Sequence, residues 1–495
     1  MYQDIDLVEI DGLMQQSWKA FMQYRNMPIA MRAAFMKKIA EELEHCGDAL
    51  IQTAMQETNL PEARLRNERG RTIFQLNNYA DACLRGEWMD IRIDTAIAEK
   101  KTPKPDIRKM QIPIGPVVVF GSSNFPFAYS TAGGDTACAL AAGCSVIVKA
   151  HPAHAATSQM VADAINKAVT ALQMPEGIFI HVHGAASAIG EALVKHPLTK
   201  AVGFTGSFVG GKQLFDWGNQ RKEPIPVFAE MGSVNPVFLL SEKLKTDAVS
   251  IAKNYAASIT LGVGQFCTNP GILVGINDNN LDIFCSVLKD EIEKIPSAKM
   301  LHNGIAKNFS ANKTKALMQQ HVETIAASTV HEQNFDESLS ANAIIATTTA
   351  DVFLQNPQLH QEVFGPYSLV VKCKTSLEML QVAEALEGQL TCTIIGTDED
   401  IAASKMLIEI ISLKCGRLVL NGVPTGVEVC LAMQHGGPFP STTDSRFTSV
   451  GADGIKRFAR PIAFQNWPNH LLPDELKDEN HLQIWRTIND IPGKH

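Results

Sequence analysis

A regular alternation of strand and helix patterns between residues 117 and 230 is the feature that most restricts how this chain can fold. Short runs rich in β-branched and aromatic residues lie at Val117–Gly121, Val146–Lys149, Ile178–Val182, Ala201–Phe204 and Val227–Glu230. Amphipathic stretches follow the first four runs, at Thr131–Ala142, Ser158–Leu172, Ala186–Lys195 and Gly210–Asn219. This repetition predicts an open, mostly parallel, doubly wound α/β sheet whose ligand lies at the carboxyl ends of the strands.

A second α/β set follows and needs a core of its own, because one hydrophobic core stops growing at roughly 250 to 300 residues and the chain has 495. Its strand patterns lie at Ile272–Gly275, Tyr367–Lys372, Thr391–Ile395 and Arg417–Asn421. Its helical patterns lie near Thr246–Ser258, Asp282–Lys294, Ser376–Leu386 and Ile401–Ile411. Two large domains are therefore expected.

Two further segments differ from this alternation. From Met14 to about Asp81 the apolar spacing is helical, whereas Trp88–Pro113 alternates apolar and charged residues around a Lys- and Pro-rich middle. The second pattern predicts an exposed two-stranded arm, and the segment Ile462–Trp467 predicts another strand exchanged with a partner. Because exposed strand edges need covering, we expect a homodimer or homotetramer.

Composition excludes several classes of partner and location. The formal charge is −8 and no run of five or more like charges occurs, so neither nucleic acid nor an anionic membrane surface is an expected partner. The amino-terminal sequence lacks a basic, apolar signal pattern, and the most apolar stretch is too short to span a bilayer. The ten cysteines show no zinc-ligand spacing. We expect a cytoplasmic protein that binds small molecules and no metal.

The stretch "GQFCTNPG", from Gly264 to Gly271, places Cys267 in a turn bounded by glycine and proline. Such a backbone favours exposure of the thiol over burial in a core. A free thiol is only a few per cent ionised at neutral pH, so a nucleophilic role requires local activation, and no histidine lies nearby in sequence. An inert buried cysteine is the alternative.

Other candidate residues lie at the ends of predicted strands, and each also has an ordinary structural explanation. Asn124, in "FGSSNFPF", suits donation to a developing oxyanion or simply the cap of a helix. The turn "GFTGS" suits a phosphate at a helix N-terminus, and Lys149 suits a dinucleotide or plain solvation. Glu230 suits a general base or a surface acid. The stretch "QEVFGPY" suits a ligand-binding site or an ordinary turn.

Taken together, Asn124, Lys149, "GFTGS", Glu230, "GQFCTNPG" and "EVFGP" occur in the order and spacing of the aldehyde dehydrogenase superfamily, and the resemblance covers nearly the whole chain. The stretches "FGSSNFPFAYSTAGGDTACALAAGCSVIVKAHPAH" and "NGVPTGVEVCLAMQHGGPFPSTTDSRFTSVG" resemble the branch that contains 2,5-dioxovalerate (α-ketoglutaric semialdehyde) dehydrogenases and certain bacterial long-chain aldehyde dehydrogenases. That branch usually has further residues before the first helix, so this chain starts late.

The resemblance implies a Rossmann-type cofactor domain, an α/β catalytic domain and a small β oligomerisation arm. Residues 1–90 and 114–232 would form the cofactor domain, 233–450 the catalytic domain, and 91–113 and 455–475 the oligomerisation strands. It also implies NAD(P)-dependent oxidation of an aldehyde to a carboxylic acid. α-Ketoglutaric semialdehyde is the expected substrate and 2-oxoglutarate the product.

Roles for individual residues follow from the same resemblance. Cys267 would attack the aldehyde, Asn124 and the backbone N–H of Cys267 would hold the oxyanion, and Glu230 would activate water to hydrolyse the thioester. The resemblance also implies a set of residues that contact the cofactor: Ser122, Lys149, Pro152, Gly206, Ser207, Glu362 and Phe364.

Cofactor preference and substrate depend on fewer residues. Pro152 stands where NAD-preferring relatives have a glutamate, so NADP is favoured over NAD, with Lys149, His151 and His154 as candidate contacts to the 2′-phosphate.

For the substrate pocket, Phe125 is a weak candidate. Arg69 and Arg71, in "ERGRTIFQL", are candidates for binding a distal carboxylate, although exposure on the helix is the alternative. Three other functions stay open: a long-chain aliphatic aldehyde dehydrogenase, a CoA-acylating enzyme, and a binding protein without catalysis. The presence of both Cys267 and Glu230 argues against a binding protein without catalysis. The presence of Glu230 argues against a CoA-acylating enzyme.

Overall fold

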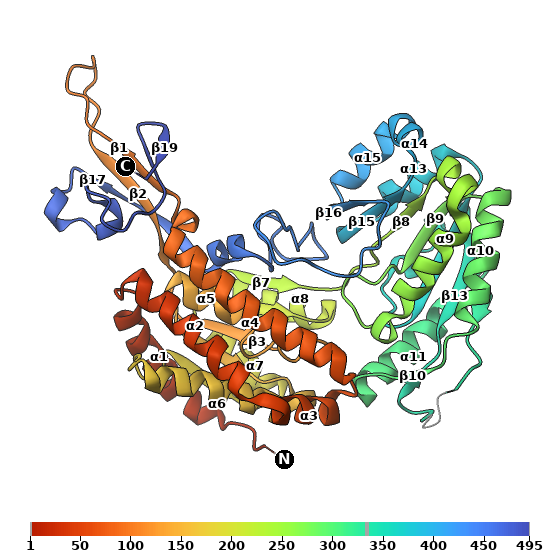
Figure 1. Ribbon diagram of the computed structural model, residues 1–495, viewed down its shortest axis with the longest axis horizontal. Helices are drawn as coiled ribbons and strands as arrows, with labels where there is room; N and C mark the ends of the chain where they lie inside the picture. Colours follow the sequence, from red (N-terminus) through yellow and green to blue (C-terminus); the bar gives the residue numbers. More distant parts are fainter. Residues whose placement is uncertain (1, 332–335, 495) are drawn as a thin grey trace.

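The computed structural model describes residues 2–331 and 336–494 of the chain. Figure 1 shows two α/β bodies and a β arm. The first body, red to yellow-green, lies at the lower left, the second, green to light blue, lies at the right, and the arm projects at the upper left. The α/β fold prediction is confirmed.

The first body contains a five-stranded sheet in which all strands are parallel, in the order β5-β4-β3-β6-β7. Two strands lie on each side of the central β3, so the chain winds outward in both directions as predicted. The bounds are β3 (Val117–Phe120), β4 (Val146–Lys149), β5 (Phe179–Val182), β6 (Ala201–Thr205) and β7 (Val227–Glu230).

Helices cover both faces of this sheet, because successive side chains of a strand point to opposite faces. Val117 and Val119 pack with the core formed by α2, α4, α5 and α6, whereas Val118 packs with that of α1, α7 and α8. The bounds are α1 (Ile10–Tyr24), α2 (Ile29–His45), α3 (Gly47–Thr58), α4 (Glu62–Arg85), α5 (Gly134–Ala142), α6 (Ala155–Ala171), α7 (Ser187–Lys195) and α8 (Phe208–Asn219).

The second body contains a seven-stranded sheet in the order β11-β13-β14-β9-β8-β15-β16, in which only β11 is antiparallel to its neighbour. The sequence patterns missed β8, β11 and β13. The bounds are β8 (Val237–Leu239), β9 (Ile272–Ile276), β11 (Glu323–Ala327), β13 (Ile344–Thr349), β14 (Tyr367–Cys373), β15 (Gln389–Ile395) and β16 (Cys415–Leu420).

The helices of the second body pack on both faces of its sheet and form two separate apolar clusters. The predicted helix at 401–411 is interrupted at Ser404 and forms two shorter ones. A two-stranded ladder pairs β10 (Ala298–Lys299) with β12 (Ser340–Ala341). The bounds of the helices are α9 (Ser241–Thr260), α10 (Asn279–Ile292), α11 (Asn303–Leu317), α12 (Ala350–Gln355), α13 (Ser376–Ala385), α14 (Asp398–Ala403) and α15 (Lys405–Ser412).

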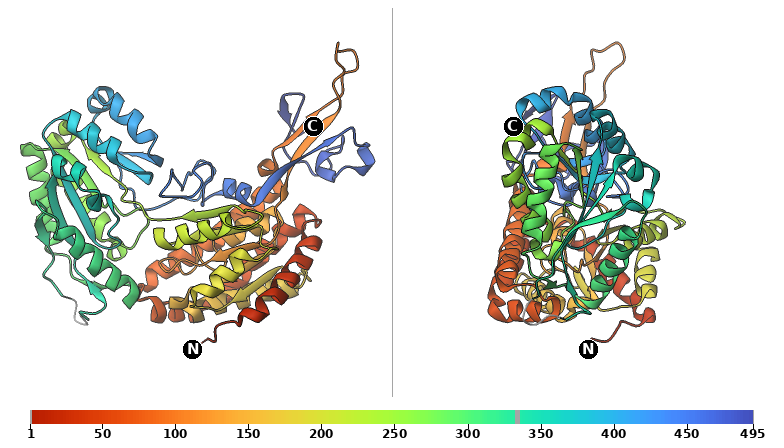
Figure 2. Two further views of the ribbon diagram at one scale, coloured as in Figure 1. Left: turned by 180° about the vertical axis from the view of Figure 1, so that it is seen from behind. Right: turned by 90° about the vertical axis from the view of Figure 1, so that its right-hand side faces the viewer.

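The arm is a five-stranded sheet in the order β17-β2-β1-β18-β19. The predicted two-stranded excursion corresponds to β1 and β2, and Figure 2 shows that their connecting loop stands clear of both bodies. The strand expected at Ile462–Trp467 corresponds to β17, an edge strand that pairs with β2 of the same chain, and its exchange with a partner stays a prediction. The bounds are β1 (Ile91–Asp94), β2 (Ile107–Pro113), β17 (Ala459–Gln465), β18 (Arg486–Ile488) and β19 (Ile491–Gly493).

Within the two described ranges, no helix combines the length and the apolar character that crossing a membrane would require.

Candidate active site

Cys267 lies on a distorted loop that joins the end of α9 to β9. Gly262, Val263 and Gly264 all have positive φ, and for a β-branched valine this left-handed backbone is strained. A Cβ at Gly264 would lie 2.3 Å from the carbonyl atoms of Gly365, so only glycine fits there. The loop turns the thiol of Cys267 toward the first body, where it is partly exposed in a cleft, as the sequence predicts.

A buried amide holds this loop in place. The Asn235 Nδ2 donates to the carbonyl oxygens of Cys267 at 2.9 Å and Asn269 at 3.0 Å, and its Oδ1 accepts from the Thr391 hydroxyl at 3.0 Å. Asn235 is fully buried and has a positive φ. Its hydrogen bonds fix the backbone on both sides of the thiol.

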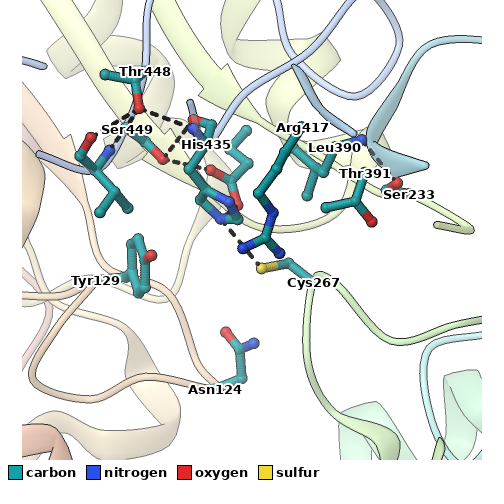
Figure 3. A network of polar contacts seen from close by, with 12 residues as sticks. Asn124, Tyr129, Ser233, Cys267, Leu390, Thr391, Arg417, His435, Thr448 and Ser449 are labelled. Atoms are coloured by element: carbon teal, nitrogen blue, oxygen red, sulfur yellow. Dashed lines mark hydrogen bonds and ion pairs between the residues drawn. The ribbon is translucent and has the colours of Figure 1, made fainter. Parts of the chain in front are cut away.

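A histidine from a distant part of the chain contacts the thiol, as Figure 3 shows, and a glutamate lies beside that histidine. The Cys267 Sγ lies 3.5 Å from the His435 Nε2, and the same nitrogen lies 3.0 Å from the Glu230 Oε1. The other carboxylate oxygen of Glu230 accepts from the Ser449 hydroxyl at 2.7 Å. Ligand atoms of Cys267, His435 and Glu230 all lie within 4.8 Å of one another. Because the thiol and the carboxylate both contact Nε2, this is a nucleophile with two adjacent proton acceptors, His435 and Glu230.

The electrostatics of this group distinguish the thiol from the carboxyl. Burial raises the pKa of the Cys267 thiol well above its usual value, and the adjacent Glu230 raises it further, while the charge of Arg71 opposes both. Burial also acts to raise the pKa of Glu230, but the charge and hydrogen bond of His435, with that of Ser449, outweigh it and lower the pKa. Glu230 is therefore ionised at neutral pH, and Cys267 is a thiol that needs a base.

Asn124 lies beside the cysteine loop on the first body. Its Nδ2 donates to the Gln265 carbonyl at 3.2 Å, which leaves the second amide hydrogen for another acceptor. The Arg64 guanidinium donates to the Asn124 carbonyl at 2.7 Å and stacks over the rings of Phe125 and Phe266 at 5.0 and 4.6 Å. Phe125 also packs edge-on against Tyr129, at 5.2 Å between ring centroids. Arg64 and Phe125 thus join the two bodies next to the thiol.

A cleft of about 440 Å³ leads from this group along the carboxyl ends of the first sheet. Ser207 caps α8 and accepts from the Gly210 N–H at 3.2 Å, so the first turn of that helix faces the cleft. The sequence-predicted residues that line the cleft are Ser122, Asn124, His151, Gly206, Ser207, Glu230, Cys267, Glu362 and Phe364. Small residues and a helix N-terminus at the end of parallel strands fit a dinucleotide.

Lys149 and Pro152 lie beside this cleft without lining it. Lys149 ends β4, and burial lowers its pKa against the opposing charge of Asp4. His154 is fully buried, and its Nε2 donates to the Ser122 carbonyl at 2.8 Å, so it is not available to a phosphate, contrary to the prediction. Burial lowers the pKa of His151 well below its usual value, so that ring is neutral.

The fold also brings an acid to this place that the sequence does not reveal. The Glu57 carboxylate, from the end of α3, accepts from the backbone N–H groups of Ala156 and Thr157 at 2.9 and 2.8 Å. It thereby occupies the N-terminus of α6, next to Pro152. No acid lies near Pro152 in the sequence, but the structure brings Glu57 close to it. The expectation that Pro152 has no acidic neighbour is therefore wrong.

Glu362 lies across the cleft on the second body. Burial raises its pKa to about 7, against a backbone hydrogen bond from Ser233. A Cβ at Gly232 would lie 2.5 Å from the Glu362 Oε2, so the chain passes directly under this carboxyl group. Near neutral pH the group therefore exchanges between acceptor-only and donor forms.

The two arginines predicted on α4 point in different directions. Arg69 donates to the Gly47 carbonyl at 2.8 Å and pairs with Glu44 at 3.3 Å, away from the cleft, so it is not part of the site. Arg71 donates to the Tyr129 hydroxyl at 3.2 Å, on the side of the thiol. Two residues along a helix correspond to a rotation of about 200°, so the two side chains cannot share a face.

Sequence reasoning missed His435, Asn235 and Glu57. His435 is 168 residues from Cys267 and sits in a glycine-rich loop, where its neighbours Gly436 and Gly437 were the only signal. Asn235 closely follows Glu230, which ends a strand. A polar residue just after a strand end is the signal that could have identified Asn235.

Comparisons with known proteins agree with the geometry. Residues 2–461 match the sequence profile of the Aldehyde dehydrogenase family. The chain is 47% identical over 468 residues to "Alpha-ketoglutaric semialdehyde dehydrogenase 2" of Azospirillum brasilense, covering 94% of this chain and 88% of that protein. It is 43% identical over 492 residues to "Alpha-ketoglutaric semialdehyde dehydrogenase" of Acinetobacter baylyi, covering 99% and 93%.

Solved structures show the same fold at low identity. A methylmalonate-semialdehyde dehydrogenase from Oceanimonas doudoroffii has a TM-score of 0.79 at 17% identity, covering 94% of this chain and 92% of that one. A 1-pyrroline-5-carboxylate dehydrogenase from Thermus, solved with bound NAD, has a TM-score of 0.78 at 19% identity, covering 93% and 86%. The resemblance seen in the sequence is thus confirmed, and the chain belongs to the aldehyde dehydrogenase family.

Proposed function

We propose that this enzyme oxidises α-ketoglutaric semialdehyde to 2-oxoglutarate with NAD or NADP, through a covalent intermediate on Cys267. The observation that carries the proposal is the contact of Cys267 with His435 and of His435 with Glu230 at the inner end of the cleft. The substrate is supported by the names of the two relatives that are 43% and 47% identical over nearly the whole chain.

The first step is ionisation of the thiol. Because burial and Glu230 hold the pKa of Cys267 high, thiolate forms only if a base takes the proton. His435 Nε2, 3.5 Å from the sulfur, accepts it when the neutral ring carries its own proton on Nδ1. The imidazolium that results lies 3.0 Å from the Glu230 carboxylate and is the charged form that lowers the pKa of that carboxyl. The thiolate then forms a bond to the aldehyde carbon.

The second step concerns the charge that develops on the aldehyde oxygen. The free amide hydrogen of Asn124 and the backbone N–H of Cys267 donate to this oxyanion. Arg64 and Asn235 keep these donors in place through the Asn124 and Cys267 carbonyl groups. A bound NAD(P) would supply the hydride acceptor, and loss of that hydride would turn the thiohemiacetal on Cys267 into a thioester.

The third step is hydrolysis. Glu230 is held ionised by His435 and Ser449, so its carboxylate accepts a proton from water as the water attacks the thioester carbon. The C–S bond breaks, the carboxylic acid leaves and the thiol is restored. A thioester transferred to coenzyme A instead would not need this carboxylate, so hydrolysis is favoured over acylation of CoA.

Cofactor contacts are proposed from the lining of the cleft. The first turn of α8, with Gly206 and Ser207, would hold the pyrophosphate, and Lys149 and Glu362 would contact the riboses. Phe364 would flank the nicotinamide ring. Pro152 permits a 2′-phosphate, while Glu57 opposes it, so we propose that the enzyme accepts NADP as well as NAD.

An assembly of two or four chains is also proposed. On the arm, large apolar side chains are exposed, among them Trp467 at 49% and Ile491 at 63%. The edge strand β16 of the second body exposes Leu420 at 56%. A second chain would cover these surfaces and the free strand edges.

A panel of aldehydes assayed with each coenzyme tests the function. We expect the highest kcat/KM for α-ketoglutaric semialdehyde and 2-oxoglutarate as the product. A higher kcat/KM for decanal would favour a long-chain aldehyde dehydrogenase, and an acyl-CoA product on addition of coenzyme A would favour an acylating enzyme. Either result would contradict the proposal.

A further inference from the structure

Two arginines from different bodies lie near the thiol without a carboxylate partner. Arg71 comes from α4 of the first body, and Arg417 from β16, the edge strand of the second body. In the described part of the chain, no ion pair involves either side chain, although arginine is rarely left unpaired when partly buried. Each side chain is therefore a cation that could bind an anionic ligand.

Among the described residues, Arg71 donates to one neutral side chain. Its terminal nitrogen donates to the Tyr129 hydroxyl at 3.2 Å, and its guanidinium lies over the Tyr129 ring at 5.6 Å. Its Nε is buried and donates to no group among the described residues. The charge of Arg71 acts to lower the pKa of the Cys267 thiol, which places it within electrostatic reach of the sulfur.

In residues 2–331 and 336–494, the hydrogen bonds of Arg417 go only to backbone carbonyl groups, and its side chain points toward the thiol in Figure 3. Its terminal nitrogens donate to the carbonyl groups of Gly426 at 3.1 Å and Pro424 at 2.6 Å. Its Nε is also buried and, within the described ranges, donates to no group. Burial lowers its pKa, and the neighbours that oppose this are Cys267 and Tyr129, with no carboxylate among them.

The acids near the thiol do not neutralise these two charges. Glu68 accepts from the N–H groups of Phe127 and Ala128, and the charge of Arg64 is the main one that favours its ionisation, ahead of that of Arg71. Glu230 is paired with His435, and Glu362 has a pKa raised to about 7. A small anion with two hydrogen-bonding ends, bound beside the thiol, would therefore be attracted by both arginines.

We propose that Arg71 and Arg417 together bind the 2-oxo carboxylate of the substrate while its aldehyde end lies against Cys267. This inference rests on the proposed oxidation of an acid semialdehyde. A guanidinium fork matches a carboxylate in geometry and charge, and the keto oxygen supplies one more acceptor for the unused N–H groups. Because the two arginines belong to different bodies, the substrate carboxylate would also connect the bodies across the thiol.

The pair would select against uncharged aldehydes. An alkyl chain offers no acceptor, so it would leave two desolvated cations and their buried N–H groups unpaired. Sites built to hydrogen-bond a polar substrate reject apolar analogues strongly for this reason. The arginine pair thus accounts for discrimination between an acid semialdehyde and an alkyl aldehyde of the same length.

The test compares kcat/KM for α-ketoglutaric semialdehyde and for pentanal in Arg71→Met, Arg417→Met and a control, Arg69→Met. Arg69 lies on the same helix as Arg71 but pairs with Glu44 outside the cleft. Because Arg71 also affects the thiol pKa, the ratio of the two kcat/KM values isolates the carboxylate contact. We expect Arg71→Met and Arg417→Met each to lower this ratio by about 10- to 100-fold and the control to leave it unchanged.

A binding readout supports the kinetic one. 2-Oxoglutarate should compete with pentanal in the unmodified enzyme, and its inhibition constant should rise about 10- to 100-fold in Arg71→Met and Arg417→Met. Should a methionine variant not fold, Arg71→Lys and Arg417→Lys keep the charge without the fork, and a reduced ratio is again expected.

The outcomes separate the two proposals. Unmodified enzyme that prefers the semialdehyde, with unchanged ratios in all arginine variants, would overturn the arginine pair and leave the proposed function standing. Unmodified enzyme that prefers pentanal would overturn both.

Discussion

Replacing His435 with glutamine tests how the thiol of Cys267 is ionised. Glutamine keeps a polar side chain of similar reach but cannot accept a proton at neutral pH. A thiol with a pKa of about 9 is only ~1% ionised at pH 7, and burial with Glu230 raises the pKa of Cys267 above its usual value. Without its base, kcat/KM at pH 7 should therefore fall by about 10²-fold or more, within the range of about 10²–10⁴ typical of a general base.

The pH dependence gives the sharper readout. In the variant, thiolate must form by simple ionisation, so the rate of Cys267 alkylation by iodoacetamide should rise about tenfold per pH unit from pH 7 to 9. The unmodified enzyme should be alkylated faster at pH 7 and show a flatter profile. His196→Gln, which alters an ion pair with Asp11 far from the cleft, serves as the control. An alkylation rate in His435→Gln that matches the unmodified enzyme across this range would refute the role of His435.

Three further predictions follow from the cofactor cleft and the arm. Pro152→Glu places a second acid beside Glu57, so kcat/KM for NADP should fall by about fivefold or more while that for NAD is retained; an equal loss for both coenzymes would contradict the assignment. Glu362 has a folded-state pKa of about 7, above its unfolded value, so its ionisation costs stability as the pH rises toward 7. Glu362→Gln should therefore match the unmodified enzyme in free energy of unfolding at pH 4 and exceed it at pH 8 by about 2 kcal/mol, less than the full shift because the side chain is partly exposed. A difference that is the same at both pH values would argue against the shift. Light scattering should give the mass of two or four chains, and a monomer at working concentration would rule out the proposed assembly.

Much of the fold follows from local pattern in the sequence. The strands of the first sheet are short β-branched runs bounded by glycine or polar residues, and four of their helices lie between them, so their order along the chain predicts the doubly wound sheet. Strands such as β8, with three residues, and β13, with its threonine-rich end, are too short or too polar to stand out. Which strands become neighbours in the second sheet depends on long-range packing that no window of sequence contains.

Only part of the candidate site could be predicted from the sequence, because long-range packing brings the other residues to it. Cys267, Asn124 and Glu230 lie in turns or at strand ends whose composition signals exposure. His435 and Glu57 reach the site from a distant loop and from a helix end, and their positions depend on how the two bodies and α3 pack. Arg69 and Arg71 could have been separated from sequence alone, because residues two apart on a helix face opposite sides.

The measurement that tests the account most directly is the mass of the cysteine peptides from Glu230→Gln after incubation with α-ketoglutaric semialdehyde and coenzyme. Thiolate attack and oxidation need no carboxylate base for water, whereas hydrolysis does, so the variant should release reduced coenzyme about once per site and then turn over slowly. The 2-oxoglutaryl group should remain on the peptide that contains Cys267, and Cys267→Ala should show neither burst nor adduct. Full steady-state turnover in Glu230→Gln, or the acyl group on another cysteine, would contradict the central claim.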